Sequence, residues 1–215
     1  MSASPAAAAE ITPSAIPPRY RNQRRRSSQS RAAICEAVRE LLTQRRLDEL
    51  TVNEIVERAE ISRPTFYAHF ETKYSVVADL VAEMGRTIYD LWVPIFDGDG
   101  PLTEAELTEV GIQTVRRWRE QGAMYAATVE GWHSDQEIHD AWNEVLEGFR
   151  VALTERLARW RPLTPPDAML VPMMIATFER SVYLAVSVPD NPLGTSDAQL
   201  AQVLATVWVT SLRGV

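Results

Sequence analysis

The sequence predicts an all-α protein with about nine helices, and three observations lead to that prediction. Apolar residues recur at three- and four-residue spacing along most of the chain, as they do on one face of a helix. No alternating apolar and polar run bounded by turns indicates a strand. Segments rich in proline and glycine separate the periodic stretches, and we therefore expect helices joined by loops.

Composition narrows the class of protein. The 215 residues allow one or two domains, and 46% apolar with 24% charged residues excludes a disordered chain. The single cysteine, Cys35, rules out an intrachain disulfide and fits a reducing compartment. No uninterrupted apolar run reaches the ~18 residues of a spanning helix, and the N-terminus has no signal-peptide pattern. We therefore expect a cytoplasmic protein that is not in the membrane.

Charge is distributed unevenly along the chain. Residues 1–73 carry a net charge of +3 and residues 74–215 a net charge of −10. Six arginines with no acid between them begin the basic part: Arg19, Arg21, Arg24, Arg25, Arg26 and Arg31. This asymmetry suggests an end that binds a polyanion and a separate body, although a basic stretch is often only a solvated tail.

The first half of the chain predicts an arm and four helices. Residues 1–22, rich in Ala, Pro and Ser, predict disorder. A helix starts near Ser28, with an apolar stripe made of Ile34, Cys35, Val38, Leu41 and Leu42. A capping box at Thr51 and Glu54 starts a short helix through Ala59. Ser62 caps a very short helix that ends near Phe70, and Thr72 caps a long one towards Ile95.

Five more helices follow the break at residues 97–101. They are expected at about 103–120, 123–130, 134–159, 167–186 and 196–213. The segments 161–166 and 189–192 contain two prolines or more each and read as linkers.

Two short helices joined by a tight turn form a helix-turn-helix arrangement. At ~100° per residue, Phe66 and Phe70 share one face of the second helix and should pack in the core. The opposite face carries the small side chains of Pro64, Thr65 and Ala68, with Tyr67 and His69 on its flanks. Such a helix can enter a major groove, where polar flanks reach phosphates and base edges.

The run TVNEIVERAEISRPTFYAHFETK, residues 51–73, resembles the DNA-binding signature of TetR-family transcriptional repressors. The resemblance implies a homodimer, an operator in double-stranded DNA, and a helical C-terminal domain that binds an inducer. It divides the chain into a basic arm (1–26), a helix-turn-helix domain (27–74) and a ligand-binding and dimerisation domain (75–215). It also implies that the last two helices form the dimer interface.

Residue by residue, the resemblance assigns a set of DNA contacts. The set consists of Thr51, Arg63, Pro64, Thr65, Tyr67, His69 and Lys73. By the resemblance, Tyr67 and Lys73 contact phosphates, while Arg63 and Thr65 read bases. Glu60 departs from the family, which commonly has glycine in this turn, and a positive φ there would cost ~1–2 kcal/mol. Tyr74 also stands where an acidic residue is common.

Aromatic residues concentrate in the C-terminal part and suggest an apolar pocket, although any one of them can be ordinary core. The expected ligand-binding set is Trp118, Tyr125, Trp142, Phe149, Phe178 and Trp208. The sequence is similar to a branch of the family in which aromatic side chains line a long apolar channel. Phe178 stands where that branch has a polar asparagine, so the ligand need not be shared.

Three other interpretations compete with a ligand-responsive repressor. The C-terminal domain could respond to a protein partner, and a solidly packed body would favour that. An all-α enzyme would need convergent titratable groups, and no nucleophile, phosphate-loop or nucleotide motif is present, so we expect no catalysis and no cofactor. His133 and Glu137 share a helix face without further ligands, so we expect no metal site.

Overall fold

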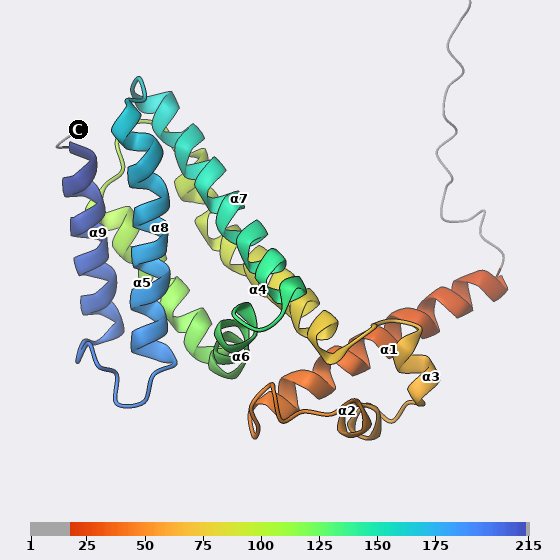
Figure 1. Cartoon of the computed structure of the whole chain (residues 1–215). Helices are drawn as coiled ribbons and strands as arrows, with labels where there is room; N and C mark the ends of the chain where they lie inside the picture. The colour runs from red at the N-terminus through yellow and green to blue at the C-terminus, as the bar shows by residue number, and fades with distance from the viewer. Residues whose placement is uncertain (1–17, 214–215) are drawn as a thin grey trace, which may run out of the picture.

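The computed structural model describes residues 18–213, and this part of the chain consists of nine helices without a strand (Figure 1). The helices are α1 (Pro18–Leu42), α2 (Val52–Arg58), α3 (Arg63–Tyr67), α4 (Lys73–Asp97), α5 (Glu104–Glu120), α6 (Gly122–Trp132), α7 (Gln136–Trp160), α8 (Pro165–Val186) and α9 (Asp197–Arg213). The all-α prediction is confirmed, and each expected helix is present.

The first helix begins ten residues earlier than the sequence analysis expected. The expectation of a disordered arm over residues 1–26 is wrong for residues 18–26, which form the first turns of α1. Residues 1–17 lie outside the described residues. Proline is well suited to a first helical turn and arginine is a strong helix former, so Pro18 and the arginines after it can extend the helix.

Polar caps define where the helices of the N-terminal part begin. Thr51 and Glu54 form the expected capping box, the Ser62 side chain accepts from the Thr65 N–H, and Thr72 accepts from the N–H groups of residues 74 and 75. Helices α1 to α3 then close over a small core that includes Ile34, Val38, Ile55, Phe66 and Phe70. Phe66 and Phe70 are buried as predicted.

The long helix α4 leads from this small unit into the C-terminal body (Figure 1). It packs along α7, while α5 packs along α9. Arg156 and Arg159 of α7 donate to the carbonyl groups of Ile95 and Phe96, so the last turn of α4 is capped by α7. Helix α4 therefore connects the N-terminal unit to the body, where α7 holds it in place.

Helix α8 is long and apolar enough to cross a membrane by length and composition alone. In the fold it packs between α7 and α9 and buries Val171, Phe178 and Val182. Its apolar character therefore reflects core packing on one side. On the other side Met169 and Met173 are 69% and 61% exposed.

The apolar residues of the last two helices, which the resemblance assigns to the dimer interface, do not all reach the surface. Six of them are buried within this chain: Val171, Ile175, Val182, Leu200, Leu204 and Leu212. Only Val203 and Val207 of α9 are exposed, at 58% and 46%. The helical period explains the difference, because the buried residues lie on the face that packs against α5 and α8, and Val203 and Val207 lie on the other.

Candidate DNA-binding surface and internal cavity

The turn between α2 and α3 sets the geometry of the helix-turn-helix unit. Glu60 has a φ of 54°, in the left-handed region that favours glycine. The Ile61 N–H donates to the Val56 carbonyl, and Ser62 then caps α3. This arrangement turns the chain sharply, so α3 lies across α2 with one face in the core and one face outward.

The outward face of α3 carries the residues that the sequence analysis named. Arg63, Pro64, Tyr67 and Ala68 are exposed, while Thr65 and His69 are half-buried. Figure 1 shows α3 at the end of the molecule away from α8 and α9. The structure therefore brings these residues together on one accessible surface.

Arg63 is held in place by its neighbours on this surface. Its Nη1 donates to Asn53 Oδ1 at 2.9 Å, and its Nη2 lies 3.4 Å from the Tyr67 hydroxyl. A guanidinium has five N–H donors, so most remain available for base edges or phosphates. Asn53 was missed in the sequence analysis, because nothing in the motif shows that α2 supports a side chain of α3.

Thr51 is exposed, but its hydroxyl serves the start of α2. It donates to Glu54 Oε2 at 2.8 Å and accepts from the Glu54 N–H. The hydrogen bonds from Thr51 lower the pKa of Glu54. A DNA contact from Thr51 therefore has to share this hydroxyl with the capping box.

Lys73 has partners that differ from the expected phosphate contact. Its ammonium donates to three backbone carbonyls, those of Leu47 at 2.7 Å, Asp48 at 2.8 Å and Leu50 at 2.7 Å. These contacts use all three ammonium protons. Partial burial lowers the pKa of Lys73. Here Lys73 ties the loop between α1 and α2 to the first turn of α4.

Further polar contacts join this loop to the body. The Asp48 N–H donates to Glu130 Oε1 of α6 at 3.3 Å, and Arg46 forms an ion pair with the same carboxylate. Arg39 of α1 also pairs with Glu83 of α4 at 2.7 Å. The N-terminal unit is therefore linked to α4 and to α6, two elements of the body.

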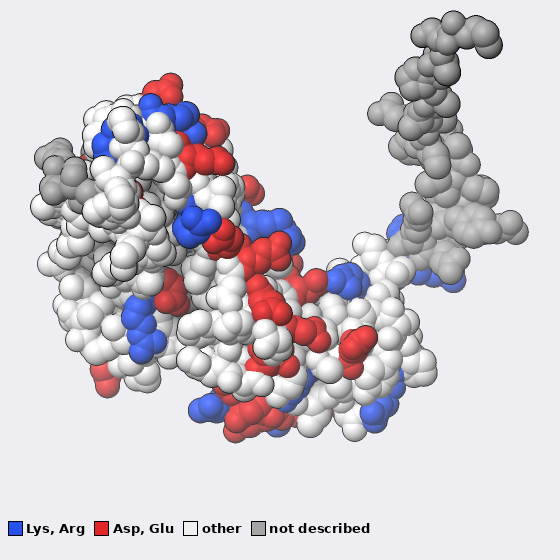
Figure 2. Space-filling view, turned by 45° about the horizontal axis from the view of Figure 1, so that its top comes forward, with Lys and Arg blue, Asp and Glu red and all other residues white. Residues whose placement is uncertain are grey.

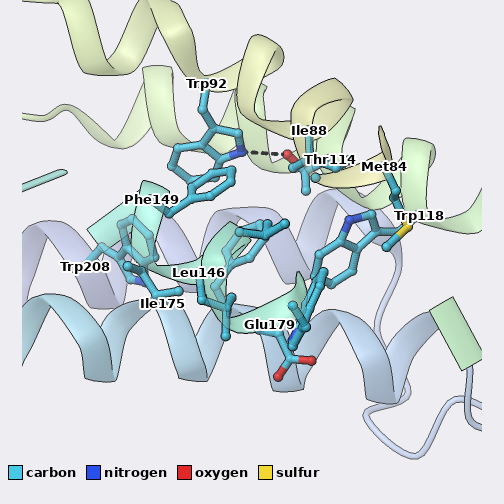
Figure 3. A pocket seen from close by; sticks show the side chains of 14 residues that line it. Met84, Ile88, Trp92, Thr114, Trp118, Leu146, Phe149, Ile175, Glu179 and Trp208 are labelled. Carbon is cyan, nitrogen blue, oxygen red and sulfur yellow. Dashed lines mark hydrogen bonds between the residues drawn. The ribbon is translucent and has the colours of Figure 1, made fainter. Parts of the chain in front are cut away.

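An apolar cavity lies in the body between α4, α5, α7, α8 and α9 (Figure 3). About 40 Å³ of it is wide enough for the centre of a water molecule. The lining residues are Met84, Gly85, Ile88, Trp92, Thr114, Trp118, Trp142, Val145, Leu146, Phe149, Ile175, Phe178, Glu179 and Trp208. The cavity is thus long and narrow rather than roomy.

Five of the six residues expected at a ligand site line this cavity. Tyr125 does not; it lies behind Trp118, with ring centroids 4.2 Å apart, and its hydroxyl donates to Glu179 Oε1 at 2.6 Å. Burial, together with the Glu179 charge, raises the pKa of Tyr125. Tyr125 therefore supports the wall of the cavity from outside.

Other lining residues were missed because they come from helices that the sequence does not show to be neighbours. Trp92 of α4 lies centrally, 5.5 Å from Phe178 and 5.7 Å from Trp208 between ring centroids. Its Nε1 donates to Thr114 Oγ1 of α5 at 2.9 Å (Figure 3). Thr114 is the one hydroxyl residue on the buried face of α5. This isolated polar residue in an apolar stripe is the signal by which the sequence could have indicated a cavity residue.

Two indole N–H groups of the lining are buried and have no hydrogen-bond partner among the described residues. They belong to Trp118 and Trp208. A buried donor without a partner is costly, and it is commonly satisfied by water or a ligand. The cavity wall is therefore apolar with donors available at two points.

The fold and this surface define a helix-turn-helix regulator: a small N-terminal unit that presents a short helix outward, joined to a larger helical body with an internal cavity. Residues 34–80 match the family described as bacterial regulatory proteins, tetR family. The N-terminal part of the chain therefore carries the DNA-binding domain of TetR-family transcriptional regulators, and the chain is similar to EthR over most of its length.

Relatives are similar to this chain over most of its length, and solved structures share its fold. EthR of Mycolicibacterium smegmatis is 24% identical over 92% of this chain and 93% of its own length. EthR of Mycobacterium tuberculosis is 25% identical over 92% of this chain and 94% of its own length. A tetR-family regulator from Streptomyces coelicolor shares the fold, with a TM-score of 0.67 and 22% identity over 84% of this chain and 79% of that one.

FadR of Bacillus subtilis, a transcriptional regulator solved in complex with stearoyl-CoA, also shares the fold. Its TM-score is 0.64, at 19% identity over 83% of this chain and 97% of that chain.

Proposed function

We propose that this protein is a cytoplasmic transcriptional repressor that binds a pseudo-palindromic operator as a homodimer and is released by a small lipophilic or aromatic effector. The observation that carries the proposal is the apolar, aromatic cavity of the body, whose wall includes the helix that leads to the DNA-binding unit. Ligand sites are typically concave and apolar with few polar groups, which fits this cavity.

The exposed face of α3 supports operator binding. Arg63 and Thr65 are proposed to read base edges, and Tyr67 and His69 to contact the backbone, with Pro64 allowing close approach. Base contacts carry sequence information, whereas phosphate contacts mainly set position. Two such helices in a dimer would address half-sites about 34–36 Å apart, or somewhat more. The other members of the expected set, Thr51 and Lys73, are proposed to act mainly by holding α2 and α4 in place.

Helices α8 and α9 support the homodimer. Their outward faces expose Met169, Met173, Val203 and Val207, all large apolar side chains. Figure 2 shows few charged side chains over this side of the molecule, at the left of the view. An exposed apolar patch with little charge is typical of a protein–protein contact.

Helix α4 supports a mechanism for release. Met84, Ile88 and Trp92 of α4 line the cavity, and Lys73 at its other end is tied to the loop before α2. A shift of α4 at the cavity would therefore move the DNA-binding unit. The effector must bind the released state more tightly than the DNA-bound state, since equal affinity shifts nothing.

The narrowness of the cavity supports a small effector, or one that widens the site as it binds. The FadR neighbour binds a long acyl-CoA in the same fold, so the fold tolerates larger ligands. The alternative of a protein partner is less favoured because an apolar cavity lined by aromatic side chains lies inside the body. The enzyme alternative has no supporting observation in the described residues, where the cavity presents one carboxylate and no nucleophile beside a base.

A selection experiment and a ligand panel test the proposal together. The full chain is used to select operator duplexes from random DNA, and lipophilic compounds are then screened for release of the selected duplex. Single-tryptophan variants that retain Trp142 or Trp208 report whether each compound enters the cavity. Compounds that release the operator without changing either fluorescence signal would contradict the cavity as the effector site.

A further inference from the structure

Two hollows of the body share a wall. The inner one is the apolar cavity described above. The outer one lies between α6, α7 and α8 and is lined by Thr128, Val129, Trp132, His133, Trp142, Glu179 and Arg180. Trp142 and Glu179 line both hollows, so they lie where the two hollows meet.

Glu179 is a half-buried carboxylate with an incomplete set of partners. Its Oε1 accepts from the Tyr125 hydroxyl at 2.6 Å. Among the described residues no donor reaches Oε2 within hydrogen-bond distance, and no Lys, Arg or His lies within ion-pair distance of the carboxylate. Burial raises the pKa of Glu179, while the Tyr125 hydrogen bond and the nearby Arg180 charge offset only part of that effect. A cation placed here would stabilise the carboxylate.

Aromatic rings surround this carboxylate. Tyr125 lies 5.8 Å from Trp142 and 4.2 Å from Trp118 between ring centroids. Figure 3 shows Glu179 at one edge of the aromatic group, with its carboxylate pointing away from Trp92 and Thr114. Ring faces attract cations, and the attraction is stronger where water is excluded. A carboxylate beside aromatic rings is therefore a site for a positively charged nitrogen.

Arg180 could instead favour an anion, because it borders the outer hollow. Its side chain is exposed, and its guanidinium lies over the Tyr183 ring, 4.8 Å from the centroid. Solvent screens an exposed charge more than a half-buried one. At the shared wall the charge of Glu179 therefore dominates.

We infer that the effector is a lipophilic amine, with its apolar body in the inner cavity and its ammonium group at Glu179, where the two hollows meet. The inference rests on the proposed function and adds the chemical class of the effector. The ammonium would donate to the free Glu179 oxygen and face the ring of Trp142, which lines both hollows. The unpartnered indole N–H groups of Trp118 and Trp208 would remain for an acceptor atom of the apolar body.

A matched set of probes with one apolar body tests the charge preference. 4-Phenylbutylamine, 4-phenylbutanol, 4-phenylbutanoate and butylbenzene are titrated into the full-length protein by calorimetry at pH 8, where the amine is protonated. We expect the amine to bind about tenfold more tightly than the alcohol, because a charge-assisted hydrogen bond replaces a neutral one. We expect the carboxylate to bind more weakly than the alcohol.

Variants then assign the preference to Glu179. Glu179→Gln keeps an acceptor for Tyr125 and removes the charge, so the amine should fall to the affinity of the alcohol. Glu155→Gln removes the same charge from an exposed position on α7 and should leave the amine preference unchanged. Arg180→Gln should leave it unchanged or increase it. If Glu179→Gln does not fold, the four wild-type titrations still decide the question.

The outcomes separate this inference from the proposed function. An amine that binds no more tightly than the alcohol, while butylbenzene and the alcohol do bind, overturns the amine preference and leaves the effector cavity intact. Tightest binding of the carboxylate overturns it in favour of an anion at Arg180. Loss of the preference in Glu155→Gln overturns the role of Glu179. Failure of all four probes to bind contradicts both proposals.

Discussion

Glu60 is the residue where local backbone strain meets the recognition unit. Its φ of 54° costs a residue with a Cβ about 1–2 kcal/mol, which glycine avoids, although glycine loses more entropy on folding. We expect Glu60→Gly to raise the free energy of unfolding by about 0.5–1 kcal/mol, measured by urea titration. Glu60→Ala is the control, because it removes the charge and keeps the strain. Equal stabilisation by both variants would assign the effect to charge.

Lys73 tests whether a residue of the recognition motif acts by contact or by position. Lys73→Met removes three hydrogen bonds to carbonyls, so the free energy of unfolding should fall by about 2 kcal/mol. Operator affinity should fall as well, because the loop before α2 loses its tie to α4. If Lys73 acts by position, the dependence of binding on salt concentration should not change. If the slope of log affinity against log salt concentration instead decreased in magnitude by about one, Lys73 would contact a phosphate after all.

Helix α8 starts with an ion pair that makes stability depend on pH. Asp167 is buried and accepts two hydrogen bonds from Arg161, at 2.8 and 2.6 Å, and two from Thr164. The Arg161 hydrogen bonds, together with those from Thr164, hold the pKa of Asp167 well below its ordinary value. A lowered carboxyl pKa contributes stability above the unfolded value of about 4, and that contribution is lost as the pH falls further.

Asp167→Asn should therefore lower the free energy of unfolding at pH 7 by about 2 kcal/mol. The difference from the wild type should narrow below about pH 4, as the wild-type carboxylate is protonated on unfolding. Urea titrations at pH 7, 5 and 3 measure both effects. A difference that stays constant over this range would mean that the loss comes from packing rather than from charge.

The packing of α4 on α7 depends on one small residue. A methyl group on Gly85 would lie 2.2 Å from Val145 Cγ2, and both residues line the cavity. We expect Gly85→Ala to lower the free energy of unfolding by about 1–3 kcal/mol, because a helix or a side chain must move. Val145→Ala should relieve the clash, so the double variant should be more stable than the sum of the single effects predicts. Additive effects in thermal or urea unfolding would show that Val145 is not the obstacle.

At the scale of the whole molecule, the outward faces of α8 and α9 govern assembly. Val203→Glu and Val207→Glu place charges on the exposed apolar face, so sedimentation should show monomers with weak operator binding. Asn143→Glu adds the same charge at an exposed position on α7 and should leave the dimer intact. Leu204, which is buried in its own chain, is unsuitable for this test, since a charge there would disrupt folding. A dimer that survives both valine changes would exclude this face as the interface.

The sequence alone determined the all-α class, the order of nine helices and the family of the recognition motif. Local rules were sufficient, since caps such as Thr51, Ser62 and Thr72 and an apolar period of 3.6 act within a few residues. It also identified five residues of the cavity, because aromatic side chains on buried helix faces are visible in the pattern. The start of α1 was predicted near Ser28 and lies at Pro18. A basic segment that begins with proline is compatible with an unstructured arm and also with a first helical turn, so the sequence did not decide between them.

Only the tertiary structure decided how these elements meet. The three carbonyls around Lys73, the Tyr125–Glu179 hydrogen bond and the central position of Trp92 each join segments that lie far apart in the chain. The face of α9 that is buried was also decided by its neighbours, because a helix that is apolar on several sides leaves the choice to packing. Contacts between distant segments depend on how the helices cross, and neither propensity nor period contains that information.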